Sequence, residues 1–239
     1  EIFQILIEKN FVFEPKHTVN LTDGSICWHS PSNIALVKYW GKTEPQIPKN
    51  SSISFTLTNC YTKTTLHYSL KKKPSRSFDF KVFFEGAEKN SFRPKIESFF
   101  NRILDYVPFI TDFSFRIETE NSFPHSSGIA SSASGMSALA LCLMSLQKIM
   151  DPHLSEADLL QKASFLARLG SGSASRSIEG PLVVWGQHPD VVGSSDQVGI
   201  PYPEEIHKVF STFHDTILLV DKGVKQVSST VGHNLMIDH

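Results

Sequence analysis

The residues best suited to chemistry lie in short segments that combine small side chains, hydroxyls and cations. Residues 124–135, Pro-His-Ser-Ser-Gly-Ile-Ala-Ser-Ser-Ala-Ser-Gly, lead directly into an apolar helical pattern. Small residues let a phosphate approach the backbone, and the free N–H groups and dipole of a helix start favour an anion. The hydroxyls of Ser126, Ser127, Ser131 and Ser132 add donors or ligands for Mg²⁺. A serine-rich turn that caps a core helix explains the same residues equally well.

Residues 170–176, Gly-Ser-Gly-Ser-Ala-Ser-Arg, again place hydroxyls and small side chains at the expected end of a helix. The guanidinium of Arg176 suits a carboxylate or a phosphate, because its fork matches two oxygens. Ser175 stands where the GxGxxG dinucleotide fingerprint requires glycine, so this fingerprint is not met. The alternative interpretation is a flexible loop with a solvated arginine.

Two lysine-bearing segments complete the set. In residues 31–42, Lys38 and Lys42 flank two aromatic side chains, and the P-loop pattern fails because Leu36 replaces its first glycine. A strand end with solvated lysines explains this segment as well. Residues 221–233 hold hydroxyls and lysines and by themselves indicate an ordinary loop. Together, the four segments favour a polyanionic ligand that is held by several loops.

The composition is that of a globular chain. It has 239 residues, 40% of them hydrophobic, and a formal net charge of -1, which excludes a general basic field for nucleic acid or an anionic membrane. The longest strongly apolar stretch, 138–144, is far shorter than the roughly 20 residues of a membrane span. Three widely separated cysteines and scattered histidines predict neither a disulfide framework nor a metal site, and favour a reducing cytoplasm.

Strand and helix patterns are mixed along the chain rather than regularly alternating, which favours an α+β fold over a doubly wound sheet. The central helix is apolar on all sides and is expected to be buried. Alternating apolar residues predict strands over 51–68, 78–84 and 113–119, and two further strands are predicted over 181–186 and 216–221. Helices are predicted over 93–107, 136–150 and 155–170.

In this order, the segments resemble the motifs of the diphosphomevalonate decarboxylases, a branch of the GHMP kinase superfamily. The resemblance covers most of the chain, from about residue 26 onward. The Lys-Tyr-Trp-Gly-Lys and Ser-Gly-Ser-Ala-x-Arg motifs are specific to this branch, whereas all GHMP kinases share the phosphate loop. The matching segments are 33–42 for the substrate motif, 123–135 for the ATP phosphate loop, 170–177 for the substrate-binding motif and 227–232 for the later serine motif.

The resemblance implies a GHMP kinase-like fold. Residues 1–190 would form its N-terminal domain, like domain 2 of ribosomal protein S5, and residues 191–239 the start of an incomplete C-terminal α/β sandwich domain. It implies an ATP- and Mg²⁺-dependent enzyme that phosphorylates the 3-hydroxyl of mevalonate 5-diphosphate. Loss of that phosphate with CO₂ would give isopentenyl diphosphate, ADP and inorganic phosphate. Positioning and charge stabilisation would supply the catalysis. A cytoplasmic location and a homodimer agree with the resemblance.

The resemblance also implies roles for individual residues. Arg176 is expected to bind the substrate carboxylate. Asn33 would orient that arginine or the substrate, and Lys38 would help electrostatically near the reacting hydroxyl. No motif fixes the adenine pocket. Contacts with the substrate are expected from Tyr39, Lys42, Ser171, Ser173 and Ser228, and contacts with ATP from Ser126, Ser127, Gly128, Ser131 and Ser132.

The sequence departs from the family pattern at two points. Ser175 replaces the usual cysteine, a change between small side chains that we expect to be tolerated. The catalytic Asp, expected in an Asp-Ala-Gly-Pro-Asn-like context, has no match, and Asp196, Asp215 and Asp221 stand in other contexts. We therefore expect the printed chain to be a fragment or to lack a tail, with little activity by itself.

Three alternatives use the same scaffold. A mevalonate 3-kinase would stop after phosphorylation, and a related decarboxylase would act on the monophosphate. A non-catalytic phosphate-binding relative would keep the loops without the acid. The basic loop over 71–76 is a further candidate for covering bound phosphates, although surface lysines are usually only solvated.

Overall fold

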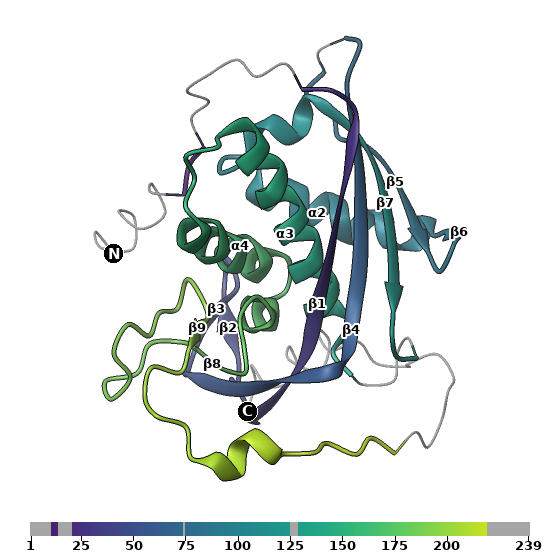
Figure 1. Ribbon diagram of the computed structural model, residues 1–239. Coiled ribbons are helices and arrows are strands. Elements are labelled where there is room, and N and C mark those ends of the chain that lie inside the picture. Colours follow the sequence, from purple (N-terminus) through teal and green to yellow (C-terminus); the bar gives the residue numbers. More distant parts are fainter. Residues whose placement is uncertain (1–10, 14–20, 74, 125–128, 219–239) are drawn as a thin grey trace.

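The computed structural model describes residues 11–13, 21–73, 75–124 and 129–218 (Figure 1). The strands are β1 (Gly24–Val37), β2 (Lys42–Thr43), β3 (Ile47–Pro48), β4 (Ser52–Leu70), β5 (Asp79–Phe84), β6 (Ala87–Glu88), β7 (Phe113–Asn121), β8 (Leu182–Trp185) and β9 (Ile200–Pro201). The α-helices are α2 (Arg93–Ile103), α3 (Ser131–Met150) and α4 (Glu156–Gly170). The 3-10 helices are η1 (Asn90–Phe92), η2 (Pro108–Thr111), η3 (Gly172–Ser177) and η4 (Lys208–Thr212).

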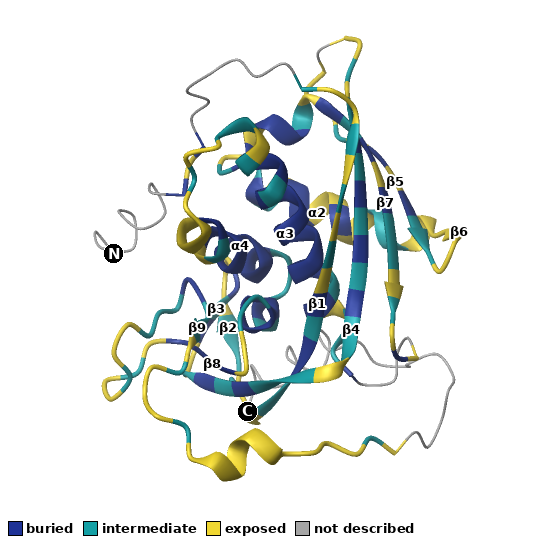
Figure 2. Ribbon diagram, in the orientation of Figure 1, coloured by how far each residue is buried: buried dark blue, intermediate teal, exposed yellow. Residues whose placement is uncertain are grey.

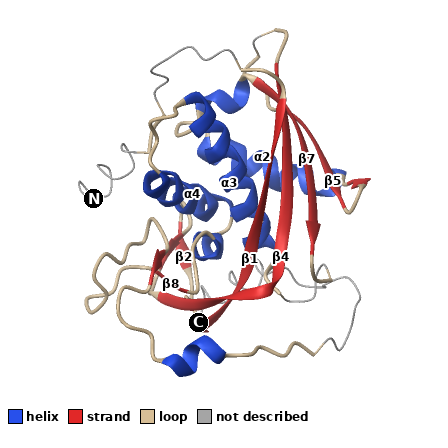
Figure 3. Ribbon diagram, in the orientation of Figure 1, coloured by secondary structure: helices blue, strands red, loops and turns tan. Residues whose placement is uncertain are grey.

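Among the described residues, one mixed sheet has the order β6-β5-β7-β4-β8-β9, with β1 also paired to β4. Strand β4 organises it: its first residues pair with β8, its later residues pair with β7, and β1 runs antiparallel along it. Helices α2, α3 and α4 lie together on one side of the strands (Figure 3). The α+β prediction is therefore confirmed.

The core lies between this sheet and the helices, where Figure 2 shows the most buried ribbon. Helix α3 is buried along most of its length, as its uniformly apolar sequence predicts. Helix α4 begins after Ser155, whose Oγ accepts a hydrogen bond from the Asp158 amide at 3.0 Å. Within the described residues, α3 alone has the length and apolarity of a membrane span. However, 72% of its apolar window is buried inside the protein, as in a core helix.

A β-bulge interrupts β1 between Pro31 and Asn33, where the register with β4 shifts. Successive side chains in a regular strand point to opposite faces, but a bulge re-aims one of them. Here both Ser32 and Asn33 are buried. The bulge therefore directs two consecutive polar side chains into the interior.

Beyond the short strands β2, β3, β6 and β9, which were not predicted, and α2, which ends at Ile103 rather than at 107, the elements differ from the predictions in three places. Strand β1 was not predicted, because the bulge and Pro31 break the alternation of its side chains. Helix α3 begins at Ser131, five residues before the predicted start at 136. No strand forms over residues 216–218, and the rest of the strand predicted to end at 221 lies outside the described residues. The domain boundary after residue 190 stays a prediction.

Candidate active site

The guanidinium of Arg176 lies at the centre of a buried polar site. Its side chain is only 3% exposed. Nη1 donates to Ser52 Oγ and Nη2 donates to Asn33 Oδ1 at 3.4 Å. The rings of Tyr39 and Trp185 lie 5.7 and 5.8 Å from the guanidinium carbon, which places an aromatic wall around the cation. The sequence therefore brings five side chains from four segments to one point.

The positive charge of Arg176 is not balanced by a carboxylate among the described residues. Among the described residues, no carboxylate forms an ion pair with Arg176, and its Nε has no hydrogen-bond partner. Burial lowers the pKa of Arg176 to about 10, partly opposed by nearby Tyr39, so the guanidinium remains charged at neutral pH. Burial likewise raises the pKa of Tyr39. An unpaired buried charge is costly, so an entering carboxylate would stabilise the site.

The bulge in β1 connects the Arg176 site to the serine-rich loop. Ser32 Oγ donates to the carbonyl of Ile129, just before α3. Its neighbour Asn33 donates from Nδ2 to the carbonyl of Ser173 at 3.1 Å and to Ser177 Oγ at 2.7 Å. Two adjacent residues of one strand therefore hold both candidate anion-binding segments.

The first turn of α3 is open to an anion. Ala130 precedes it in the left-handed conformation, with φ 50°, and no side chain among the described residues caps the helix. The turn is held instead by Ser134 Oγ, which lies 2.6 Å from Thr62 Oγ1 on β4. Ser131 is half-buried and Ser132 is exposed. Uncapped N–H groups and two hydroxyls at a helix start suit a phosphate.

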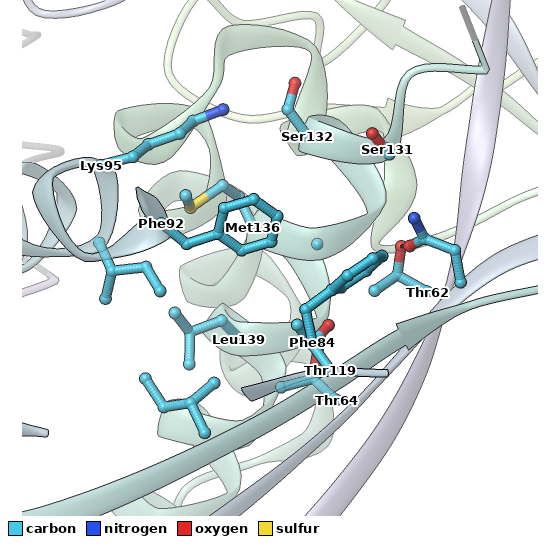
Figure 4. Close-up of a pocket in the computed structure, with 14 residues that line it drawn as sticks. Thr62, Thr64, Phe84, Phe92, Lys95, Thr119, Ser131, Ser132, Met136 and Leu139 are labelled. Carbon is cyan, nitrogen blue, oxygen red and sulfur yellow. Dashed lines mark hydrogen bonds between the residues drawn. The ribbon is translucent and has the colours of Figure 1, made fainter. Parts of the chain in front are cut away.

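Beside this turn lies a cavity of about 140 Å³ (Figure 4). Phe84, Phe92, Met136 and Leu139 supply apolar walls, and threonine hydroxyls lie on the β4 and β7 side. The Lys95 side chain points toward Ser132 across the mouth of the cavity (Figure 4). An apolar slot next to a phosphate-binding helix start has the chemistry that a nucleotide requires.

Cations from separate segments gather near this mouth. Lys95 is exposed, but neighbouring protein atoms displace part of the water around its ammonium group, and this desolvation lowers its pKa. The positive charge of Lys42 lowers the pKa further. Burial also lowers the pKa of Lys42; Glu44 opposes this shift and Arg102 adds to it. Lys42 Nζ donates to Gln46 Oε1 at 2.6 Å. Neighbouring like charges that disfavour each other indicate a place for polyvalent anions.

The structure places the predicted residues unequally. Arg176, Asn33 and Tyr39 meet in one site, and Ser171 and Ser173 border it in and beside η3. Lys38 is exposed after β1, and its carbonyl accepts a hydrogen bond from Asn50. Four further residues predicted for the site lie outside the described part of the chain: Ser126, Ser127, Gly128 and Ser228.

The basic loop after β4 is not part of this site. Lys71 Nζ donates to the carbonyls of Ser77 and Thr111, at 2.5 and 2.7 Å. The loop follows Leu70, whereas Ser52 at the other end of β4 contacts Arg176. At about 3.3 Å per residue, the length of this strand separates the two by tens of ångströms. The idea that the loop covers bound phosphates is not supported.

Sequence reasoning missed several residues of the site. Ser52 and Trp185 contact Arg176 only because β4 and β8 pair across it. Lys95 and Gln46 stand in segments without any motif. The one available sign was the aromatic ending of the Leu-Val-Val-Trp strand, which follows the Arg176 segment closely.

The fold and the site together indicate the class: an α+β protein of the GHMP kinase fold, with candidate phosphate- and carboxylate-binding segments tied to one strand. Residues 30–197 match the family model described as the diphosphomevalonate decarboxylase-like N-terminal domain. The chain belongs to the diphosphomevalonate decarboxylase family.

Individual relatives agree with this assignment. The chain is 32% identical to the diphosphomevalonate decarboxylase of Bos taurus over 226 residues, 87% of this chain and 52% of that protein. It is similar to the mevalonate diphosphate decarboxylase structure from Staphylococcus aureus, with a TM-score of 0.65 and 31% identity, covering 89% of this chain and 59% of that one. It is also similar to MDDEF in complex with MVAPP, AMPPCP and magnesium, with a TM-score of 0.55 and 33% identity, covering 74% and 49%. The chain thus spans about half the length of the curated relatives that it matches.

Proposed function

We propose that the protein catalyses the ATP-dependent decarboxylation of mevalonate 5-diphosphate to isopentenyl diphosphate. The observation that carries this proposal is the buried guanidinium of Arg176, which forms no ion pair within the described part of the chain. Its partner Asn33 directly follows Ser32, the residue that holds the serine-rich loop at Ile129. A pure kinase needs a phosphate site, whereas a decarboxylase must also hold a carboxylate next to it. Arg176 meets that second requirement.

Arg176 binds the carboxylate of the substrate in this proposal. Asn33 and Ser52 fix Nη2 and Nη1, and Nε is left as the nitrogen without a partner. Trp185 and Tyr39 keep water away from the ion pair. Fixing the acid in a dry pocket aligns the bond that must break and lowers the entropic part of the barrier.

The substrate diphosphate lies between η3 and the Lys42 turn. Ser171 and Ser173 offer hydroxyls there, and Lys42 offers a partly buried ammonium. The nucleotide places its phosphates at the first turn of α3, near Ser131 and Ser132. Its base enters the apolar cavity of α3, and Lys95 contacts the phosphates at its mouth.

Magnesium fits the donor set of this site. It prefers oxygen ligands, keeps several waters and is commonly carried by substrate phosphates with one or two protein groups. The described residues hold no cluster of three acidic, histidine or cysteine side chains for a dedicated metal site. The hydroxyls of Ser131 and Ser132 would therefore hold a magnesium ion that arrives with ATP, where it would screen phosphate charge.

The chemistry proceeds in two stages. The 3-hydroxyl oxygen attacks the γ-phosphorus of ATP and gives its proton to a water molecule, and ADP leaves. The C–O bond to the new phosphate then breaks while the C–C bond to the carboxylate breaks, and that electron pair forms the alkene with release of CO₂. Cations beside both phosphate tails stabilise the charge that develops on the leaving groups.

The activity is tested by supplying mevalonate, its 5-phosphate and its 5-diphosphate to the complete protein with ATP. We expect ADP and CO₂ in equal amounts from the 5-diphosphate. ADP without CO₂ would identify a 3-kinase, and preference for the monophosphate would identify the sister decarboxylase. Binding of both ligands without turnover would identify a non-catalytic relative.

The role of Arg176 is tested by Arg176→Lys and Arg176→Met. Lysine keeps the charge but cannot keep both hydrogen bonds, so we expect kcat to fall by about 10²-fold or more in both variants. Calorimetry should show unchanged ATP affinity. A near wild-type kcat in Arg176→Met would remove Arg176 from the reaction.

The cytoplasm is the compartment that we assign to this activity. The three described cysteines are free thiols, which agrees with a reducing environment. The homodimer suggested by the resemblance stays a prediction.

A further inference from the structure

We propose that Arg168 is a positioning residue that sets the place of Lys42 by clamping the turn between β2 and β3. This inference rests on the proposed function and adds a residue that no motif assigned. It is carried by a chain of contacts that leads from the buried face of α4 to the ammonium group of Lys42.

Arg168 is more deeply buried than Arg176, with 0% exposure. Its Nη1 donates to the carbonyl of Pro45 at 2.5 Å. Nε and Nη2 donate to the carbonyl and the side-chain Oε1 of Gln197, at 2.9 and 2.6 Å. One rigid guanidinium therefore joins two loops that are 150 residues apart in sequence.

The first loop ends at the substrate side. Gln46 follows Pro45 directly, is 6% exposed and has a φ of 62°. Its Oε1 accepts the hydrogen bond from Lys42 Nζ at 2.6 Å. Non-glycine residues rarely adopt this left-handed conformation, and they keep it where the surroundings impose it. The hydrogen bond from Arg168 to Pro45 supplies that constraint.

The second loop packs against η3. Trp185 Nε1 donates to the carbonyl of Asp196 at 2.9 Å, and the amide of Gly199 donates to Ser164 Oγ at 2.9 Å. Ser164 Oγ also donates to the carbonyl of Ser175 at 3.0 Å. Ser164 and Arg168, one turn apart on α4, thus tie the Lys42 turn and the Arg176 segment to the same helix.

The guanidinium fork is essential to this role. A lysine at position 168 has one donor group at the end of a flexible stem and cannot span both loops. Loosening the turn lets Gln46 and Lys42 move apart, which weakens binding of the diphosphate. The carboxylate and ATP sites keep their own supports, so the effect should be confined to one ligand.

The test uses Arg168→Lys and Gln46→Leu in the complete protein. Because a hydrogen bond to a charged group contributes roughly one factor of ten, we expect the Kd of inorganic pyrophosphate and the KM of mevalonate 5-diphosphate to rise about tenfold. We expect kcat and the KM of ATP to change less than about threefold. Gln46→Leu serves as the second variant because it leaves the buried arginine and its packing in place.

Two controls separate positioning from general loosening. Glu44→Gln removes the exposed ion pair between Glu44 and Arg102 in the same turn, and should change the pyrophosphate Kd less than about threefold. In a Lys42→Met background, Gln46→Leu should have no additional effect, because the group that it positions is gone.

The outcomes are distinct for the two proposals. Pyrophosphate affinity equal to wild type in both Arg168→Lys and Gln46→Leu overturns the clamp, as does an equal loss in the Lys42→Met background. Wild-type protein that binds pyrophosphate without releasing CO₂ overturns the proposed function, while the clamp is still judged by the affinities of the variants.

Discussion

Lys162 shows how far a single side chain can depart from its usual chemistry in this core. Its ammonium donates to Gln147 Oε1 at 2.7 Å and to the carbonyl of Tyr106 at 2.9 Å. Burial lowers its pKa from 10.5 to about 7. Between these values the unfolded chain binds a proton that the native protein has released, so stability rises with pH in this window.

We therefore expect the free energy of unfolding to increase between about pH 7 and pH 9, by at most about 1.4 kcal/mol per pH unit from this residue. Urea unfolding at both pH values measures the increase. In Lys162→Met this contribution should vanish. An identical pH slope in the variant would show that other groups cause it.

The residues of the site differ in how well the sequence reveals them. Arg176 follows a run of small residues in the sequence, and an arginine in such a segment predicts an anion-binding site. Its partners Ser52 and Trp185 are ordinary strand residues, and only the pairing of β4 with β8 gives them a role. Long-range pairing depends on the whole chain, which is why local patterns identify the guanidinium and not its supports.

At the scale of elements, η3 owes its shape to close packing against β8. A Cβ on Gly172 would lie 2.6 Å from Cη2 of Trp185. The indole cannot retreat easily, because it is fully buried and its Nε1 is hydrogen-bonded to Asp196. Gly172 therefore permits the aromatic ring that lies beside Arg176.

Gly172→Ala should lower the free energy of unfolding by about 1–3 kcal/mol, the usual cost of overpacking, and weaken binding of the acid substrate. Thermal unfolding and calorimetry measure these effects. Gly135→Ala is the matched control, since nothing lies within 4 Å of its added Cβ. Equal stability of wild type and Gly172→Ala would mean that the ring moves freely.

The ends of the elements were harder to predict than their existence. Glycine is a poor helix former, so the helix was predicted to begin at residue 136, directly after Gly135. In the fold, Ser134 bonds to Thr62 and Ser137 Oγ donates to the carbonyl of Ala174 at 2.7 Å, which extends the helix to Ser131. Tertiary contacts thus override local propensity at the turn where a phosphate would bind.

At the scale of the molecule, the cavity beside α3 makes the nucleotide site testable without touching polar groups. Gly135 lines this cavity and has open space around its Cα. Gly135→Leu should fill the cavity and raise the Kd of ATP about tenfold or more, while pyrophosphate binding stays unchanged. Gly135→Ala should gain up to about 1 kcal/mol of stability as a better helix residue. Unchanged ATP affinity in Gly135→Leu would place the base elsewhere.

The α+β class followed from the sequence because mixed strand and helix patterns are a property of the whole chain. The strand order did not, since β1 and β8 both join β4 from distant positions. The family model covers residues 30–197, which hold the three α-helices and most of the sheet, but not β9 or the first residues of β1.

The bulge in β1 limits which parts of this fold can change in length. Because Ser32 and Asn33 anchor the two ligand-holding segments from neighbouring positions, the spacing between those segments is a property of one strand. Their connecting stretches can therefore change in length, and the spacing between the proposed ATP and carboxylate sites stays the same. Deleting one residue of the bulge, in contrast, would shift one segment relative to the other, although every motif would still be present.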